Sequence, residues 1–246
     1  MTPTTTPATG TRPGAVRDRR TFWRLLLAFV APMSGLALAA ANAVSPSSLG
    51  GSAEDEVTSI AAHQGAAEAS LWFSLLFVLT LIPGAIAVAW VCRRRRPSLT
   101  AVAGCLAIFG FLTGMANPST NMVALIGAQK GVDHDTLVTL VDATSNSIFV
   151  SVALLPFLLA ITFGRLLLGI LLWRARVAPR WMAAALIAAV PVEFLNISGG
   201  NLQPTISWAL TGIGFASATV ALLRMSNDEF DLPPLLAAPA SSGGLE

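Results

Sequence analysis

Six apolar runs, each close to 20 residues long, constrain this chain more than any other feature of its sequence. A helix rises 1.5 Å per residue, so about 20 apolar residues cross the roughly 30 Å of hydrocarbon in a bilayer. Backbone groups cannot face lipid unpaired, which leaves helices as the expected conformation. We predict an all-α, polytopic membrane bundle in which six transmembrane helices occupy residues 22–44, 71–92, 99–116, 148–173, 181–197 and 205–224.

The composition agrees with this class. Residues of the hydrophobic set make up 54% of the 246 residues, and charged residues only 11%, against about 25% charged residues in soluble domains. So little charge cannot cover a soluble protein of this size. The composition also excludes a disordered chain and a nucleic-acid-binding protein.

Apart from Arg165, arginine lies in alternate segments between the runs or at the adjoining ends of the runs, and this distribution predicts the orientation. Cytoplasmic loops of membrane proteins carry the excess of Lys and Arg, so both termini are predicted to be cytoplasmic. Residues 1–20 then form a disordered basic tail, residues 21–225 the membrane domain, and residues 226–246 a flexible tail. The basic residues on this side are Arg12, Arg17, Arg19, Arg20, Arg24, Arg93, Arg94, Arg95, Arg96, Arg174, Arg176, Arg180 and Arg224.

All six tryptophans lie at or within a few residues of the ends of the runs, where amphipathic rings occupy the membrane interface. The abundance of Ala, with 14 Arg to one Lys, indicates a GC-rich bacterial genome and hence the plasma membrane of a bacterium.

One alternative concerns the first run. Its end, Ala41-Asn42-Ala43, resembles a signal-peptide cleavage site, and cleavage would leave five spans.

Two long loops, residues 45–70 and 117–147, are predicted to lie outside. In the second loop Asp133 is a plausible N-cap for a short helix. Leu137, Val138, Leu140 and Val141 form one apolar stripe along this helix. The segment is too short to span a bilayer, so we expect a lid over the bundle or an interfacial helix.

Glu193 is the residue most out of place in its run. It lies about 12 residues into the fifth run, roughly 18 Å from the cytoplasmic end. A carboxylate at such depth usually faces a cavity or a partner, and Pro191 adds local polarity by leaving a helix carbonyl without its donor. The alternative is a Glu near the outer headgroups that snorkels or bonds a neighbouring helix.

Arg165 interrupts the fourth run, about 12 Å from its inner end. We expect its long side chain to snorkel to the cytoplasmic phosphates. In the alternative interpretation it reaches across to Glu193.

Further polar residues gather near the predicted outer ends of the spans. If these ends converge, they form an outward vestibule with Glu193 at its floor, and the candidate ligand-binding residues are then Glu193, Arg165, Asp142, Asn146, Asn196, Asn117 and Asn121. Helix capping and loop hydration are the alternative roles for Asn and Asp. The remaining members of this polar cluster are Asn201 and Gln203.

His63 and His134 are the only histidines in the sequence, and both fall in the outer loops. With Glu68, Asp133 and Asp135 they could supply ligands to a divalent cation. No metal-binding spacing such as H-x-x-x-H is present, so solvated loop histidines are the default interpretation. We expect no cofactor and identify no catalytic motif.

The segment Gly164–Trp181 contains a short basic junction, Arg176-x-x-Pro179-Arg180-Trp181, between the fourth and fifth runs. Here the chain resembles a large group of uncharacterised bacterial membrane proteins, a six-span domain of unknown function common in actinobacteria and bacilli. The segments Ala61-Ala-His63-Gln-Gly65 and Leu140-Val-Asp142-Ala are also similar to that group. The resemblance implies the six-span architecture and carries no known activity.

Three functional hypotheses follow. In the first, the protein binds or transports a small solute or a lipid-like molecule through the outer vestibule. In the second, it is a non-catalytic accessory or immunity-type protein that acts through a membrane-protein partner or as a homo-oligomer. In the third, it is an intramembrane enzyme that uses Glu193 as a general acid with Asp142, or a metal at His63 and His134.

Overall fold

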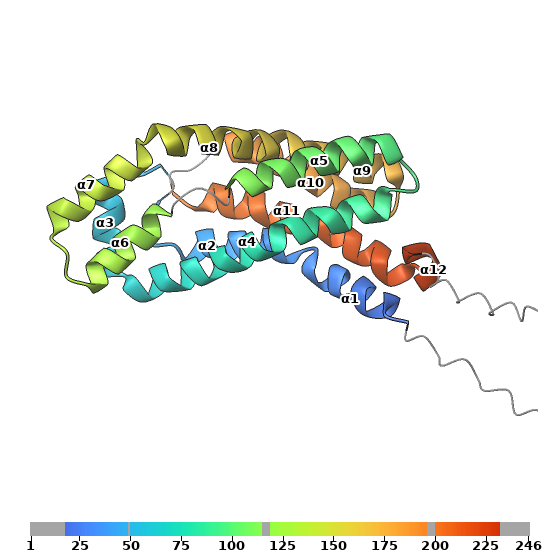
Figure 1. The fold of residues 1–246 in the computed structure, drawn as a ribbon, viewed down its shortest axis with the longest axis horizontal. Helices are drawn as coiled ribbons and strands as arrows, with labels where there is room; N and C mark the ends of the chain where they lie inside the picture. Colours follow the sequence, from blue (N-terminus) through green and yellow to red (C-terminus); the bar gives the residue numbers. More distant parts are fainter. Residues whose placement is uncertain (1–17, 49, 115–118, 196–199, 232–246) are drawn as a thin grey trace, which may run out of the picture.

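The computed structural model describes residues 18–48, 50–114, 119–195 and 200–231, and in this part of the chain every regular element is a helix. The helices form an elongated bundle (Figure 1). In chain order they are α1 (Arg20–Val30), α2 (Met33–Val44), α3 (Ala53–Ala62), α4 (Gln64–Cys92), α5 (Pro97–Gly114), α6 (Thr120–Gln129), α7 (His134–Ser145), α8 (Ile148–Leu159), the π-helix η1 (Ala160–Gly164), α9 (Arg165–Ala175), α10 (Arg180–Phe194), α11 (Leu202–Arg224) and α12 (Asn227–Phe230).

Five helical segments of the described residues are long and apolar enough to cross a membrane. They are Arg20–Val44, Gln64–Cys92, Pro97–Gly114, Ile148–Ala175 and Leu202–Arg224, and each coincides with a predicted run. The fifth predicted run corresponds to α10, which has 15 residues and is therefore about 22 Å long. The structure thus confirms the helical class and gives five candidate membrane-spanning segments among the described residues.

Proline interrupts two of these segments. Pro32 separates α1 from α2, because proline has no N–H to donate and its ring clashes with the preceding turn. Pro156 lies inside α8, one turn before the π-helical stretch η1. A π-helical turn is a local widening of the helix that is frequent at functional sites, and this one directly precedes Arg165.

The bundle is apolar on its outside as well as inside. Leu79, Phe109 and Ile148 expose 62%, 68% and 79% of their surfaces, which is typical of side chains that face lipid. Inside, small residues let the helices approach closely. A Cβ atom on Gly35 of α2 would lie 2.2 Å from the backbone nitrogen of Gly212 in α11.

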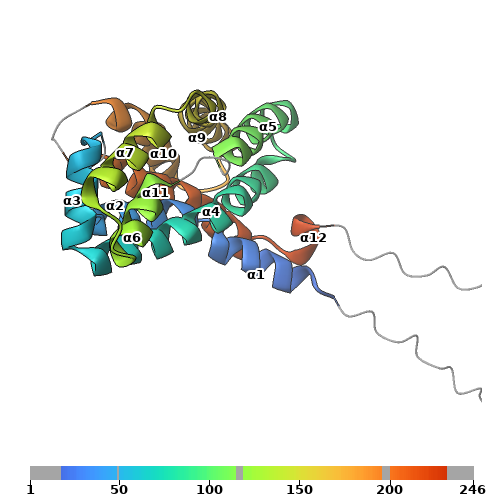
Figure 2. The ribbon, with the colours of Figure 1, turned by 60° about the vertical axis from the view of Figure 1, so that its left-hand side comes forward.

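Helices α3, α6 and α7 pack together at one end of the molecule, and we call this group the cap (Figures 1 and 2). Asp133 caps α7 as predicted, accepting a hydrogen bond from the Thr136 N–H (3.3 Å). Of the predicted apolar stripe, Leu137 and Val141 are buried, whereas Leu140 is 48% exposed. A separate apolar cluster joins the cap to the start of α4 and comprises Val57, Ile60, Ala67, Ala124, Leu125, Leu137 and Val141.

The segment from Ser226 to Asp231, predicted as the start of a flexible tail, is folded at the opposite end of the molecule (Figure 1). Ser226 and Glu229 form a reciprocal capping box at the start of α12. Phe230 is 4% exposed, and its carbonyl accepts a hydrogen bond from Trp90 Nε1 (3.1 Å). The prediction missed this docking because a short polar sequence does not show what its single Phe will contact.

Candidate functional site: a buried ion pair

Arg165 begins α9, immediately after the π-helical turn, and its side chain is completely buried. Its Nε donates to the carbonyl oxygen of Ile161, one turn earlier (2.6 Å). Its Nη2 donates to Oε2 of Glu193 on α10 (2.7 Å). A buried guanidinium must be paired or hydrogen-bonded in this way, because leaving it unpaired away from water is costly.

The prediction that Arg165 snorkels to a lipid interface is therefore wrong, and the alternative ion pair with Glu193 is present. The nearer end of the helical segment Ile148–Ala175, at Ala175, is about 15 Å away along the helix axis. Close packing of α9 against α10 instead brings a carboxylate within direct reach.

Glu193 is the penultimate residue of α10, and its side chain is 24% exposed. Its Oε2 accepts two hydrogen bonds, from Arg165 Nη2 and from Ser207 Oγ (2.6 Å). Among the described residues Oε1 has no hydrogen-bond partner. The carboxylate thus uses one oxygen to neutralise Arg165 and keeps the other for a further donor.

Helix α11 supplies the rest of the site. Nη1 of Arg165 donates to Thr211 Oγ1 (3.2 Å) and to Ser207 Oγ (3.4 Å). The guanidinium carbon lies 4.5 Å from the ring centroid of Trp208, an arrangement that gives a cation–π interaction. Trp208 is only 3% exposed, so its predicted place in the membrane interface is wrong.

Sequence reasoning missed Ser207, Trp208 and Thr211 as members of this site. A signal was present, because Ser207 and Thr211 are four residues apart and share one face of an apolar helix. Hydroxyl groups on such a face indicate bonding between helices. They do not indicate which helix supplies the partner.

The predicted vestibule residues separate into three groups. Gln203 joins the site, since its Nε2 donates to the backbone carbonyl of Glu193 (2.7 Å). Asn201 instead donates to the carbonyls of Ser45 and Ser47, and Ser47 Oγ donates to Asn121 (3.4 Å). Asn146, the C-cap residue of α7, donates to Asp142 on that helix (3.0 Å), and neither has a hydrogen bond to the Arg165 site among the described residues. Asn117 and Asn196 lie outside the described residues.

The two histidines lie in or beside the cap. His134 Nε2 contacts Glu54 Oε1 (2.9 Å), and this hydrogen bond raises the pKa of His134 above its usual value. His63 Nδ1 lies 3.2 Å from the carbonyl of Ser59. Within the described ranges no three His, Cys, Asp or Glu side chains are grouped to hold a metal ion. The structure therefore gives no set of ligands for the metal site that was considered as an alternative. Asp133, one of its candidate ligands, serves as a helix cap.

The fold and this site define a class: a multi-pass helical membrane protein with a charged pair buried among its helices. The sequence places the chain more specifically. It belongs to the family described as a domain of unknown function, DUF4386, whose model matches residues 23–226. A search of curated proteins and a search of solved structures found no match.

Proposed function

We propose that this protein spans the plasma membrane of a bacterium six times, with both termini in the cytoplasm, and binds or carries a small polar solute at Glu193. The solute carries a hydrogen-bond donor, either an ammonium or a hydroxyl group. A carboxylate within a membrane bundle is by default a candidate functional group, and this one is oriented by a buried arginine.

The single observation that carries the proposal is the unequal use of the two Glu193 oxygens. Oε2 is committed to Arg165 and Ser207, whereas Oε1 has no partner among the described residues and the side chain remains 24% exposed. A carboxylate that served only to neutralise Arg165 would gain most by burying both oxygens in hydrogen bonds. The free acceptor therefore suits a ligand that donates.

The proposed sixth span is supported by the packing of α10. The proposed cytoplasmic location of both termini is supported by the distribution of the arginines. Helix α10 packs along α9 and α11, and Arg180 and Trp181 at its start are typical interfacial anchors. A helix of about 22 Å can span if the bilayer thins locally or its flanking residues snorkel.

The first helix pair is expected to remain in the mature protein. Ala41 of α2 is buried, and its carbonyl accepts a hydrogen bond from Ser70 Oγ (3.0 Å). Cleavage at Ala41-Asn42-Ala43 would remove a helix that packs against both α4 and α11.

Thermal unfolding of the full-length protein in detergent tests the proposal. Ammonium, ethanolamine and putrescine chlorides serve as donor probes. Tetramethylammonium chloride is the matched control, because it has the charge without an N–H. We expect at least one donor probe to raise the unfolding midpoint, since ligand at ten times its Kd adds about 1.4 kcal/mol, while tetramethylammonium does not.

The Glu193→Gln variant should lose this stabilisation, and Glu68→Gln, the same change at an exposed carboxylate on α4, should retain it. Because Glu193→Gln leaves a buried arginine unpaired, Arg165→Gln/Glu193→Gln serves as a charge-balanced companion and should also fail to respond. Stabilisation that persists in both Glu193 variants would remove this residue from the binding site.

A further inference from the structure

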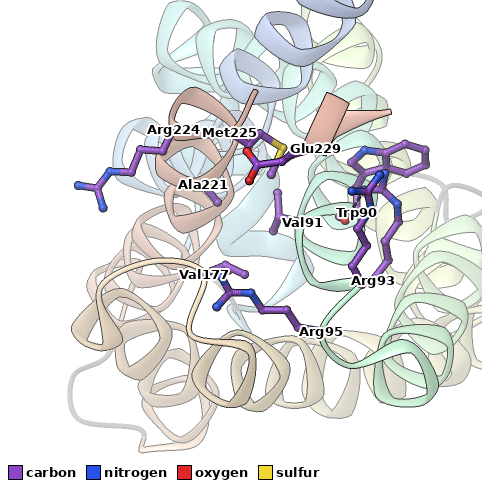
Figure 3. Close-up of a pocket in the computed structure, with 10 residues that line it drawn as sticks. Trp90, Val91, Arg93, Arg95, Val177, Ala221, Arg224, Met225 and Glu229 are labelled. Carbon is purple, nitrogen blue, oxygen red and sulfur yellow. Dashed lines mark hydrogen bonds between the residues drawn. The ribbon is translucent and has the colours of Figure 1, made fainter. Parts of the chain in front are cut away.

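A polar pocket lies at the α12 end of the bundle, among the ends of α4, α9 and α11 (Figure 3). Its volume is about 290 Å³. Arginines dominate its charged lining, with Glu229 as the opposing carboxylate. The lining comprises Trp90, Val91, Arg93, Arg94, Arg95, Val177, Ala221, Arg224, Met225 and Glu229.

The pocket arginines are held in place by backbone carbonyls rather than by carboxylates. Nη1 of Arg93 donates to the Trp90 carbonyl (2.7 Å) and Nη2 to that of Phe230 (2.5 Å). Nη1 of Arg95 donates to the carbonyls of Ala175 (2.9 Å) and Arg176 (3.1 Å). Carbonyls position these guanidinium groups without neutralising them.

Some guanidinium N–H groups at this pocket have no hydrogen-bond acceptor among the described residues. Nε and Nη2 of Arg95 have no acceptor among the described residues. Arg94 makes one long contact, from Nη2 to the Asp228 carbonyl (3.4 Å). Figure 3 shows that Arg224 points away from the cavity. The donors that face the cavity therefore come chiefly from the run Arg93–Arg95.

Crowding of positive charge is evident at Arg93. Its guanidinium stacks on the Trp90 ring, 3.7 Å from the ring centroid. Burial and the neighbouring charge of Arg94 lower the pKa of Arg93 from its usual value, and the carboxylate of Asp231 offsets this only in part. An anion placed between these groups would relieve that repulsion.

We propose that this pocket binds a phosphate group through Arg93, Arg94 and Arg95. Planar guanidinium groups match the oxygens of phosphate and can bind them in a bidentate manner. The phosphate belongs either to an anionic lipid headgroup or to a free anion in solution. This site is separate from Glu193, so neither proposal depends on the other.

Binding is measured on the full-length protein in two arms, each by the shift of the thermal unfolding midpoint. In one arm the protein is in nanodiscs of phosphatidylcholine with or without phosphatidylglycerol. In the other it is in neutral detergent with inorganic phosphate. A response to phosphatidylglycerol alone assigns a lipid headgroup, a response to phosphate alone assigns a soluble anion, and a response to both assigns the phosphate group itself.

Arg95→Gln is expected to weaken the responding interaction about tenfold, because a charge-assisted hydrogen bond contributes about 1.5–3 kcal/mol and 1.4 kcal/mol is tenfold. Arg94→Gln, at an exposed residue that should not affect folding, should act in the same direction. Arg96→Gln is the matched control: it removes the same charge from the same run at an exposed residue outside the pocket lining, and it should change binding less than twofold.

Glu229→Gln gives a test of opposite sign. The capping box with Ser226 survives this change, since Gln serves the same role, while the carboxylate that faces the arginines is removed. Anion binding should tighten severalfold. No response in either arm would overturn the proposal. Equal losses of binding in the Arg94, Arg95 and Arg96 variants would also overturn it, because they would show only a nonspecific attraction between anions and the positively charged end of the bundle.

Discussion

Arg165 and the run Arg93–Arg95 show two ways in which this protein accommodates arginine. Arg165 is fully buried and has a carboxylate, two hydroxyls, a carbonyl and a Trp ring around it. In the run Arg93–Arg95 the guanidinium groups have carbonyls and one Trp ring, and the hydrogen bonds of these three arginines involve no carboxylate of the described residues.

The difference follows from what surrounds each group. A charge enclosed by apolar helices has no water or lipid headgroup to compensate it, so the fold itself must supply the counter-charge. A charge at the end of the bundle can be compensated by water or by anions, and the fold needs only to orient it. The run Arg93–Arg95 makes no hydrogen bond to a carboxylate of the described residues, and this is the basis for proposing that an anion binds there.

The largest expected effect comes from breaking the buried pair. Glu193→Gln should lower the free energy of unfolding by about 3–5 kcal/mol, because it leaves the Arg165 charge buried without its partner. Arg165→Met/Glu193→Leu, which removes both charges, should recover most of that loss. Unfolding in mixed detergent micelles measures both, with the exposed Glu68→Gln as the control, expected to lie within about 0.5 kcal/mol of the wild type. A double variant no more stable than the single one would show that the charges are not coupled.

The two arginine–tryptophan stacks allow a smaller and more direct test. Trp208→Phe weakens a desolvated cation–π contact, worth about 2 kcal/mol or more when intact, whereas Trp90→Phe weakens one at a half-exposed site, worth about 0.5–1 kcal/mol. The Trp90→Phe variant also loses the hydrogen bond from Trp90 Nε1 to the Phe230 carbonyl, which reduces the expected difference in stability between the two variants. The same unfolding assay should rank Trp208→Phe as the more damaging change, and the reverse order would mean that burial does not separate the two regions.

The smallest effect is expected at the exposed pair of the cap, His134 and Glu54. Because its hydrogen bond to Glu54 raises the pKa of His134, this pair stabilises the fold fully below the unfolded-state pKa of about 6.5. The contribution is lost as the pH rises through the raised folded-state value. The wild type should therefore be slightly more stable than His134→Gln at acidic pH and equal to it at alkaline pH. His63→Gln is the control, and a difference between wild type and His134→Gln that persists at alkaline pH would exclude this ion pair as its cause.

The fold class could be read from the sequence because the bilayer imposes a simple rule. Long apolar runs must be helical, so the positions of the five helical segments long and apolar enough to span were predictable. The N-cap at Asp133 was predictable for a local reason, since its acceptor and the Thr136 donor are three residues apart. The helix α6 and the docked segment around Phe230 were not predicted, because their stability comes from contacts with distant parts of the chain.

The candidate site also has features that the sequence alone predicts and features that depend on contacts between distant parts of the chain. By itself the sequence determined that Glu193 and Arg165 are out of place in apolar helices, since a charge within such a run is costly whatever surrounds it. Only the tertiary structure decided that the two residues bond each other, that Trp208 is buried over Arg165, and that Asp142 and Asn146, at the end of α7, do not bond to this pair. These outcomes depend on which helix faces come into contact, and a sequence in which nearly every face is apolar does not specify them.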